Sequence, residues 1–249
     1  MSLDERIASP EGKRRYVRAL FAEIADRYDF ITAFLSYGRD KAWKRRLVRL
    51  AAPRRAMRAL DLATGTGDIA FALRARGASV VGLDVTPRMI ELAAAKANGA
   101  RNPSFLVGDM VRLPFRSASF DLVTTGYGLR NVPSLERAVD EMARVLAPGG
   151  LALSLDFNRP ANALVRRAYL LYLTVVGGFL GRMLHGDPDT YRYIAASIRA
   201  YPGAEAVRRL MEASGFTDVH YLPVLGGLMA IHSARRSASD ARRMPAEGA

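Results

Sequence analysis

The stretch that decides the fold is Met57-Arg58-Ala59-Leu60-Asp61-Leu62-Ala63-Thr64-Gly65-Thr66-Gly67-Asp68-Ile69-Ala70. Its part from Ala59 to Ala63 is apolar except for Asp61, which predicts a buried strand of a parallel sheet. Apolar residues then recur at helical spacing from Ile69 to Leu73. Strand, glycine turn and helix together form the unit that brings backbone close to a nucleotide-like ligand. Gly65 and Gly67 suit the turn because they carry no Cβ that would keep a ligand away.

Acidic residues accompany three successive predicted strands. Asp61 lies in the first strand, Ser79–Asp84 forms a second that ends in an acid, and Ser104–Val107 forms a third that is followed by Asp109. An acid at the end of the second strand accepts hydrogen bonds from ribose hydroxyls, and Asp109 is placed to read an adenine amino group. We therefore expect the three acids to surround one ligand at the carboxyl edge of the sheet.

The glycine turn nominally fits the dinucleotide pattern G-x-G-x-x-G/A, but Asp68 argues against a dinucleotide. A carboxylate beside the helix N-terminus would repel a pyrophosphate, which disfavours a dehydrogenase. The same carboxylate, with Asp61, suits a ligand that carries an ammonium and a sulfonium, as S-adenosylmethionine (SAM) does. The arrangement resembles the class I SAM-dependent methyltransferases; a generic Rossmann-like turn with surface acids is the alternative.

Length and composition indicate one domain of 249 residues, half of them hydrophobic. Because cysteine is absent, disulfides and thiolate zinc sites are excluded, and we expect no metal and a cytoplasmic setting. The segment from Met1 to Pro10 is polar and does not look like a signal peptide. The net charge of +13 comes largely from arginine and suits an anionic membrane surface or a nucleic acid, or reflects a GC-rich genome. Neither zinc-finger spacing nor an RNA-binding aromatic signature is visible, so we expect no nucleic-acid partner.

Strands and helices alternate along the chain, which predicts an α/β fold with a doubly wound, mostly parallel, seven-stranded sheet. A helical lid is expected to follow the fifth strand. The later elements are predicted to be a strand over Ser119–Thr125, a helix from Pro133 to Leu146, a strand over Leu151–Leu155, a helix over Ala204–Ser214, and strands over Thr217–Val224 and Leu228–Ser233 around a turn at Gly226-Gly227.

The ends of the chain are predicted to be less regular. Met1 to Lys13 reads as a mobile arm, followed by an amphipathic helix that ends at Tyr28-Asp29 and by a second helix over Lys41–Ala52. The predicted divisions are residues 1–56 for the arm and N-terminal helices, 57–160 for the SAM-binding core, 161–203 for the lid, 204–234 for the last helix and strands, and 235–249 for a disordered tail.

The lid contains a stretch of 14 residues without charge, Ala168–Gly181, between Arg167 and Arg182. As a helix it would span about 21 Å, which is shorter than the roughly 30 Å hydrocarbon core of a membrane. It is therefore expected to lie at a membrane interface or to be a buried lid helix, and both readings stay open. Gly177-Gly178 is expected to break or bend it.

Longer motifs resemble one methyltransferase family. The string Phe21-x-x-Ile24-Ala25-x-Arg27-Tyr28-Asp29, followed by Leu35-Ser36-x-Gly38 and Trp43, is similar to the C-methyltransferases of ubiquinone and menaquinone biosynthesis. The match continues through Leu113-Pro114-Phe115, Gly128-Leu129-Arg130-Asn131-Val132, Pro148-Gly149-Gly150, Tyr191-Arg192-Tyr193 and Ala230-Ile231-His232, and covers roughly Val17 to Ala234. The Gly-Leu-Arg-Asn-Val and Tyr-Arg-Tyr segments are its most specific parts.

This resemblance implies transfer of a methyl group from SAM to a ring carbon of a polyprenylated benzoquinol or naphthoquinol. The residues expected to bind SAM are Asp61, Gly65, Thr66, Gly67, Asp84, Met89, Asp109, Met110 and Gly126. For the quinol, Arg130 could stabilise a phenolate or instead form an ion pair with a lid or strand acid, beside Asn131. Tyr28 could close over the site, and His232 is a candidate base or a structural histidine; His185 and His220 have weaker claims.

Three departures from the family pattern fall on the substrate side. They are Thr32 in place of an asparagine, Gly178 in place of a proline, and Gly226-Gly227 in place of a Thr-x-Gly turn. They leave open a methyltransferase that acts on another lipophilic phenol or polyketide ring. A non-catalytic SAM-binding subunit of a quinone-synthesis complex is a further alternative. Peripheral contact with the inner face of the cell membrane is expected, and the sequence does not decide whether the chain forms a homodimer.

Overall fold

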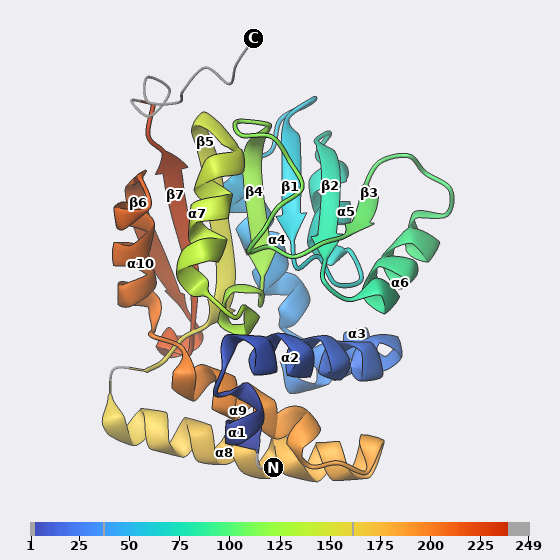
Figure 1. Ribbon diagram of the computed structural model, residues 1–249, viewed down its shortest axis with the longest axis vertical. Coiled ribbons are helices and arrows are strands. Elements are labelled where there is room, and N and C mark those ends of the chain that lie inside the picture. Colours follow the sequence, from blue (N-terminus) through green and yellow to red (C-terminus); the bar gives the residue numbers. More distant parts are fainter. Residues whose placement is uncertain (1–2, 37, 161, 239–249) are drawn as a thin grey trace.

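The computed structural model describes residues 3–36, 38–160 and 162–238. A seven-stranded sheet with the order β3-β2-β1-β4-β5-β7-β6 forms the centre (Figure 1). Neighbours from β3 to β5 are parallel, while β7 runs antiparallel to both β5 and β6. The strands are β1 (Arg58–Leu62), β2 (Ser79–Asp84), β3 (Ser104–Val107), β4 (Phe120–Gly126), β5 (Leu146–Phe157), β6 (Phe216–Val224) and β7 (Met229–Arg236). The α/β fold with a seven-stranded sheet is confirmed.

Helices cover both faces of the sheet. On one face α4 (Asp40–Ala51) and α5 (Asp68–Arg74) pack on Ala59 and Leu153, and on the other α7 (Leu135–Val145) and α10 (Ala204–Ala213) pack on Leu60 and Ala152. Successive residues of a strand point to opposite faces, so a strand buried on both faces is apolar nearly throughout. This is why the run around Leu60 reads as continuously apolar. The remaining helix of the core, α6 (Pro87–Ala97), packs beside β2 and β3.

A separate layer of helices lies across the carboxyl edge of the parallel strands (Figure 1). It comprises α1 (Leu3–Ile7), α2 (Pro10–Ile24), α3 (Tyr28–Leu35), α8 (Ala163–His185) and α9 (Asp189–Ala200), with the short turn η1 (Ala25–Arg27) between α2 and α3. Val17, Leu20 and Ile31 from the N-terminal helices share one apolar cluster with Leu180 and Tyr191 from the lid. Segments about 150 residues apart in sequence therefore form one body over the ligand edge.

The structure corrects the predictions for both ends of the chain. Residues 3–7 and 10–13 are helical rather than a mobile arm, and Ser9 caps the N-terminus of α2 by accepting a hydrogen bond from Gly12 N. Tyr28 begins α3 rather than ending a helix. Strand β7 extends to Arg236, two residues into the predicted tail, since Arg235 and Arg236 still pair with β5 and β6. Residues 1–2 and 239–249 lie outside the described residues.

The lid helix α8 was predicted to break or bend at Gly177-Gly178, and the structure shows that it does not break. It runs without interruption over 23 residues, which corresponds to about 34 Å. The glycines serve the contact with α9 instead. A Cβ on Gly177 would lie 2.8 Å from the backbone oxygen of Tyr191, and one on Gly181 would lie 2.5 Å from that of Asp187. Their missing side chains let the two helices approach closely.

These contacts predict opposite effects for two neighbouring substitutions. Gly177→Ala should lower the free energy of unfolding by about 1 kcal/mol or more, because crowding against a backbone that cannot yield outweighs the gain of about 1 kcal/mol in helix propensity. Gly178→Ala is the matched control: its Cβ meets only the end of the Arg192 side chain, which is partly exposed and can move. It should be neutral or stabilising. Urea unfolding followed by circular dichroism measures both, and equal stabilisation by the two alanines would contradict the contact.

Candidate active site

The glycine turn is held in shape by the acid at the end of β2. Asp84 is buried, and its Oδ2 accepts a hydrogen bond from Gly65 N at 2.9 Å while its Oδ1 accepts one from Thr86 N at 2.9 Å. Gly65 and Gly67 adopt φ values of +55° and +92°, which glycine reaches without strain. The turn and the second strand therefore form one rigid edge.

A cleft lies above this edge and is lined by most of the residues expected to bind SAM: Gly65, Asp84, Met89, Asp109, Met110 and Gly126. Thr66 lines a smaller cavity that adjoins the cleft. Gly67 lines neither; a Cβ there would lie 2.7 Å from the Phe71 ring, so this glycine serves local packing. The backbone turn and the paired acids fit the ribose, the adenine and the cationic end of SAM.

Asp61 stands apart from the other acids because it supports the turn from below. It is fully buried, and its oxygens accept hydrogen bonds from Thr64 Oγ1 at 2.6 Å and from Thr124 Oγ1 at 2.8 Å. It is not among the residues that line the cleft. Burial raises the pKa of Asp61 to about 6, although the two threonine hydroxyls oppose the shift.

Helix α2 supplies residues to the cleft that sequence reasoning missed. Arg14, Val17 and Phe21 line it, and Arg14 forms an ion pair with Asp109, with Nη2 3.1 Å from Oδ2. Lys13 donates a hydrogen bond from Nζ to the backbone oxygen of Arg130 at 2.9 Å. The helical spacing of Val17 and Phe21 predicted burial, but nothing local indicated that they would cover the ligand edge.

A second, larger cavity adjoins the cleft. It has a volume of about 510 Å³ and is lined largely by apolar and aromatic side chains from α2, α3, α8, α9 and the turn η3 (Leu225–Gly227). Arg130, Arg39, Thr32, Ser36 and Thr190 contribute its polar part. Phe21, Tyr28 and Tyr127 line both the cavity and the cleft, so these shared side chains lie where the two spaces adjoin. Burial raises the pKa of Tyr28, which keeps its hydroxyl protonated.

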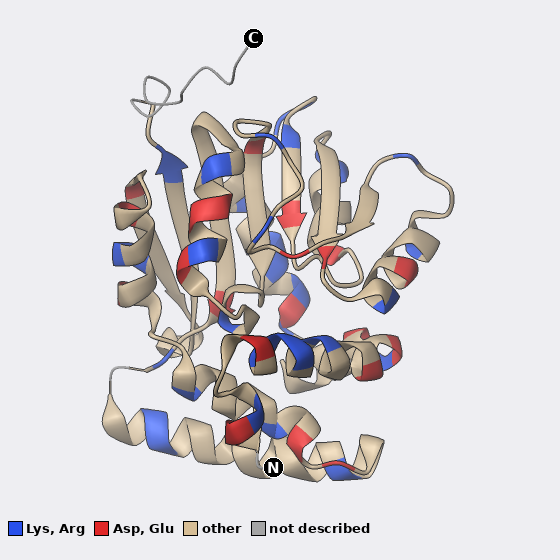
Figure 2. Ribbon diagram, in the orientation of Figure 1, with Lys and Arg blue, Asp and Glu red and all other residues tan. Residues whose placement is uncertain are grey.

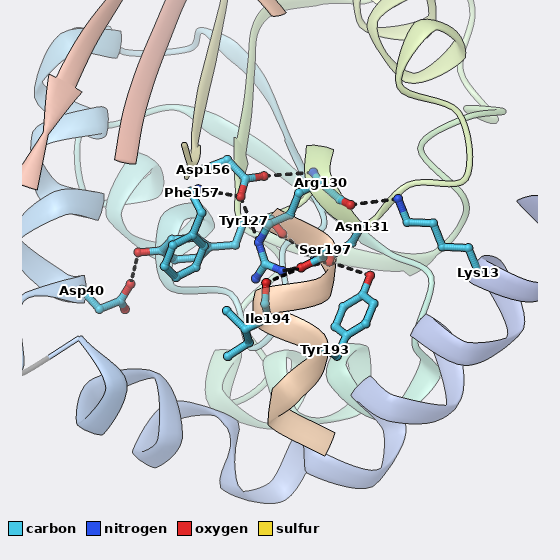
Figure 3. A network of polar contacts seen from close by, with 10 residues as sticks. All are labelled: Lys13, Asp40, Tyr127, Arg130, Asn131, Asp156, Phe157, Tyr193, Ile194 and Ser197. Atoms are coloured by element: carbon cyan, nitrogen blue, oxygen red, sulfur yellow. Dashed lines mark hydrogen bonds and ion pairs between the residues drawn. The ribbon is translucent and has the colours of Figure 1, made fainter. Parts of the chain in front are cut away.

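Arg130 reaches this cavity from η2 (Leu129–Asn131) and is held from several sides (Figure 3). Its Nε lies 3.1 Å from Asp156 Oδ1, its Nη1 donates to Ser197 Oγ at 2.8 Å, and its backbone N donates to Asp156 Oδ2 at 3.1 Å. Its guanidinium carbon lies 4.9 Å from the centre of the Phe157 ring. The arginine thus lines the larger cavity and also pairs with a strand acid. Burial raises the pKa of Asp156, although Arg130 opposes the shift.

Asn131 joins the lid to the core beside Arg130. Its Nδ2 donates to the backbone oxygen of Tyr127 at 2.7 Å, and its Oδ1 accepts from Tyr193 Oη at 3.0 Å (Figure 3). It also lines the cleft above the glycine turn. Its amide both donates and accepts hydrogen bonds, which suits a positioning role.

His232 does not reach either cavity. It is 2% exposed, its Nε2 lies 2.9 Å from the backbone oxygen of Ala204 on α10, and burial lowers its pKa. Direct proton abstraction from a ligand in these cavities does not fit this position. His185 contacts Tyr191 Oη at 2.9 Å behind the cavity wall. Within the described part of the chain, no three or more His, Asp or Glu side chains gather as a metal site would require.

Comparisons with known proteins agree with this geometry. The sequence model of the ubiE/COQ5 methyltransferase family matches residues 9–236. A demethylmenaquinone methyltransferase of Thermus thermophilus is 43% identical over 87% of this chain and 100% of its own length, and a ubiquinone/menaquinone biosynthesis C-methyltransferase of Methylococcus capsulatus is 38% identical over 88% and 91%. A crystal structure of a SAM-dependent methyltransferase from Thermotoga maritima superposes with a TM-score of 0.64 at 20% identity, covering 89% of this chain and 100% of its own.

The burial of Asp61 predicts how stability depends on pH. In the folded protein its carboxyl keeps a proton up to about pH 6, whereas the unfolded chain releases it near pH 3.8, so this group makes wild type less stable as pH rises through that window. Asp61→Asn removes this dependence. As pH rises from 5 to 8, the free energy of unfolding of the variant minus that of wild type should therefore increase by about 1 kcal/mol. Denaturant unfolding of the cofactor-free protein at both pH values measures it, and parallel pH profiles would contradict the raised pKa.

Proposed function

Because the chain belongs to the ubiE/COQ5 methyltransferase family, we propose that it transfers the methyl group of SAM to a ring carbon of a polyprenylated quinol. It is a SAM-dependent methyltransferase of quinone biosynthesis. The acceptor we propose is demethylmenaquinol, which becomes menaquinol, or the equivalent ubiquinone precursor. The observation that carries this proposal is the large apolar cavity that shares Phe21, Tyr28 and Tyr127 with the cofactor-side cleft.

Different residues of the cleft would contact different parts of the cofactor. Asp84 and Asp109 would take the ribose and the adenine, while the turn at Gly65 and the backbone at Gly126 would face the rest of the molecule. When bound, SAM supplies an electrophilic methyl group on a sulfonium. An acceptor seated against the apolar walls of the larger cavity would displace water, which would strengthen the electrostatic interactions at the point of transfer.

Arg130 would act on the acceptor. A phenol ring carbon is a weak nucleophile, and the ring becomes far more reactive once its hydroxyl loses a proton. A guanidinium at the cavity wall favours the phenolate, and contacts with Asp156 and Ser197 hold it in position before the substrate arrives. Tyr28 lines both spaces and Asn131 lines the cleft, and the two would orient the ring from there.

Two of the departures from the family pattern, at Thr32 and at Gly226-Gly227, lie at or beside the larger cavity proposed to hold the acceptor. Thr32 lines the apolar cavity, and the two glycines stand beside Leu225 and Leu228, which also line it. Another lipophilic phenol is therefore the rival acceptor.

The test is incubation of the purified protein with labelled SAM and, separately, reduced demethylmenaquinol and a demethoxy-ubiquinol precursor. Label in a lipid-extractable quinone is expected. In the same assay Arg130→Gln should lower kcat about 100-fold, with the loss shrinking as pH approaches the value near 10 at which phenols ionise unaided. Tight SAM binding without label in either quinol would refute the acceptor. A loss of kcat in Arg130→Gln that is the same at every pH would refute the phenolate role.

We also propose that the enzyme meets its lipid substrate at the inner face of the cell membrane through α8. Leu164, Leu171, Val175 and Phe179 recur along one exposed side of this helix, each at least 61% exposed. Tyr172 and Leu225 are partly exposed and also line the cavity, so its rim adjoins this side. In Figure 2 the helix carries basic positions and no acidic ones. Its arginines suit anionic head groups.

Among the described helices, α8 is the one that is long and apolar enough to cross a membrane. Its opposite side, however, packs on α9 through Gly177 and Gly181. We propose that it lies in the membrane surface with only its exposed side in contact with lipid. This accounts for both readings of Ala168–Gly181, since one side of the helix is buried in the lid and the other is free.

Vesicle binding tests this contact. The triple variant Leu171→Ser, Val175→Ser, Phe179→Ser should reduce co-sedimentation with anionic phospholipid vesicles at least ten-fold, because each apolar side chain loses on the order of 1 kcal/mol or more of transfer free energy. Leu50→Ser, at an exposed apolar position on α4, is the control and should bind as wild type does. Unchanged vesicle binding, together with a wild-type dimer that the triple variant converts to monomer, would assign this face to a second copy of the chain instead.

A further inference from the structure

Lys44 is a largely buried cation at the glycine-turn end of the cofactor-side cleft. It stands on α4 with its side chain 12% exposed. Its Nζ lies 2.7 Å from Asp40 Oδ2 and 3.0 Å from Asp68 Oδ2, and 5.9 Å from the centre of the Tyr127 ring. Nothing in its sequence context distinguishes it from the other basic residues of the same helix.

The cavity that Lys44 lines is an extension of the cleft. This small cavity is bounded by Lys44, Thr66 and Asp68, and it shares Tyr28, Ala63, Gly65, Gly126 and Tyr127 with the cleft. Asp84 and Asp109 line the cleft but not the small cavity. Since these acids suit the ribose and adenine, the extension toward Lys44 is left for the amino-acid end of SAM.

The charges at this end call for a cation. The amino-acid end of SAM carries an ammonium and a carboxylate. The ammonium can pair with a carboxylate of the protein, and Asp68 lines the small cavity. The carboxylate of SAM needs a positively charged partner. Among the described residues that line the cleft and its extension, the cationic ones are Arg14 and Lys44. Arg14 pairs with Asp109 at the adenine end. Lys44 is therefore the cation available to the carboxylate.

The environment of Lys44 suits this role. An ammonium has three N–H donors, and Asp40 and Asp68 engage two of them. Burial alone would lower the pKa of Lys44, but the carboxylates of Asp40 and Asp68 oppose this shift and the pKa is raised, so the side chain stays charged. Asp40 is itself fixed by a hydrogen bond from Tyr127 Oη at 2.7 Å. The cation is thus held in place before any ligand binds.

We propose that Lys44 binds the carboxylate of the methionine portion of SAM, with Asp40 and Asp68 holding its ammonium in position. The inference rests on the proposed function only in taking SAM as the methyl donor. Since S-adenosylhomocysteine keeps the same carboxylate, Lys44 would stabilise donor, transition state and product alike. Such uniform binding changes the affinity for the cofactor rather than the rate of the chemical step.

A comparison of two ligands with two variants tests this contact. Calorimetry gives Kd for SAM and for decarboxylated SAM, which lacks only the carboxylate. Wild type should bind SAM 10- to 100-fold more tightly, the range expected for a buried charge-assisted hydrogen bond. Lys44→Gln should weaken SAM binding by that factor, leave decarboxylated SAM unchanged or tighter, and so abolish the discrimination. Lys44→Arg, which keeps the charge, should retain most of it. In turnover the Gln variant should raise KM for SAM and leave kcat within about three-fold.

Lys41→Gln is the matched control, since it removes one lysine from an exposed position of the same helix. Its Kd values for both ligands should stay within two-fold of wild type. Equal weakening of both ligands by Lys44→Gln would mean that Lys44 only supports the fold, and equal affinity of wild type for both would also overturn the proposal. If the protein still methylates a quinol, neither of these two results contradicts the proposed function. A different outcome separates the two proposals. If Lys44→Gln loses the discrimination between the two ligands but the protein methylates neither quinol, the role of Lys44 is supported and the proposed acceptor is refuted.

Discussion

The buried ion pair between Arg130 and Asp156 connects the parts of this molecule that form the site. Asp156 is near the end of β5, Arg130 follows β4, Ser197 comes from α9 of the lid, and Lys13 of α2 binds the Arg130 backbone (Figure 3). Removing one partner of a buried pair costs about 3–5 kcal/mol, because the other charge remains without compensation. The pair therefore joins the sheet to both helical segments that cover it.

Two cavities of different character adjoin each other where the helices lie across the edge of the sheet. The cleft takes its polar groups from loops at the carboxyl edge of the sheet, as ligand sites of parallel sheets do. The larger cavity takes its apolar walls from helices that lie across that edge. Tyr28 and Tyr127 belong to both, so a polar cofactor and a lipid ring can each have suitable surroundings within reach of one another.

Local sequence was sufficient for the residues that line the cleft from the loops at the sheet edge. Gly65, Asp84 and Asp109 belong to short strand-and-turn units whose geometry repeats wherever such units occur, and the structure brings them to one cleft. Position along a strand did not tell which way His232 would face; in the register that places it opposite Ser154, its side chain contacts Ala204 of α10. Gly177 read as a helix breaker, whereas its neighbour across the lid, Tyr191, gives it a packing role that no local pattern reveals.

The sequence by itself determined the order of strands and helices, the glycine turn and the acids around it, because these depend on residues within a few positions of one another. Only the tertiary structure decided that α2 covers the cleft, that Arg130 pairs with Asp156, that Lys44 lies at the end of the cleft and that α8 leaves an apolar side exposed. Each of these joins segments far apart in the chain. Their contacts follow from how whole helices fill space over the sheet edge, which periodicity and spacing within one segment do not encode.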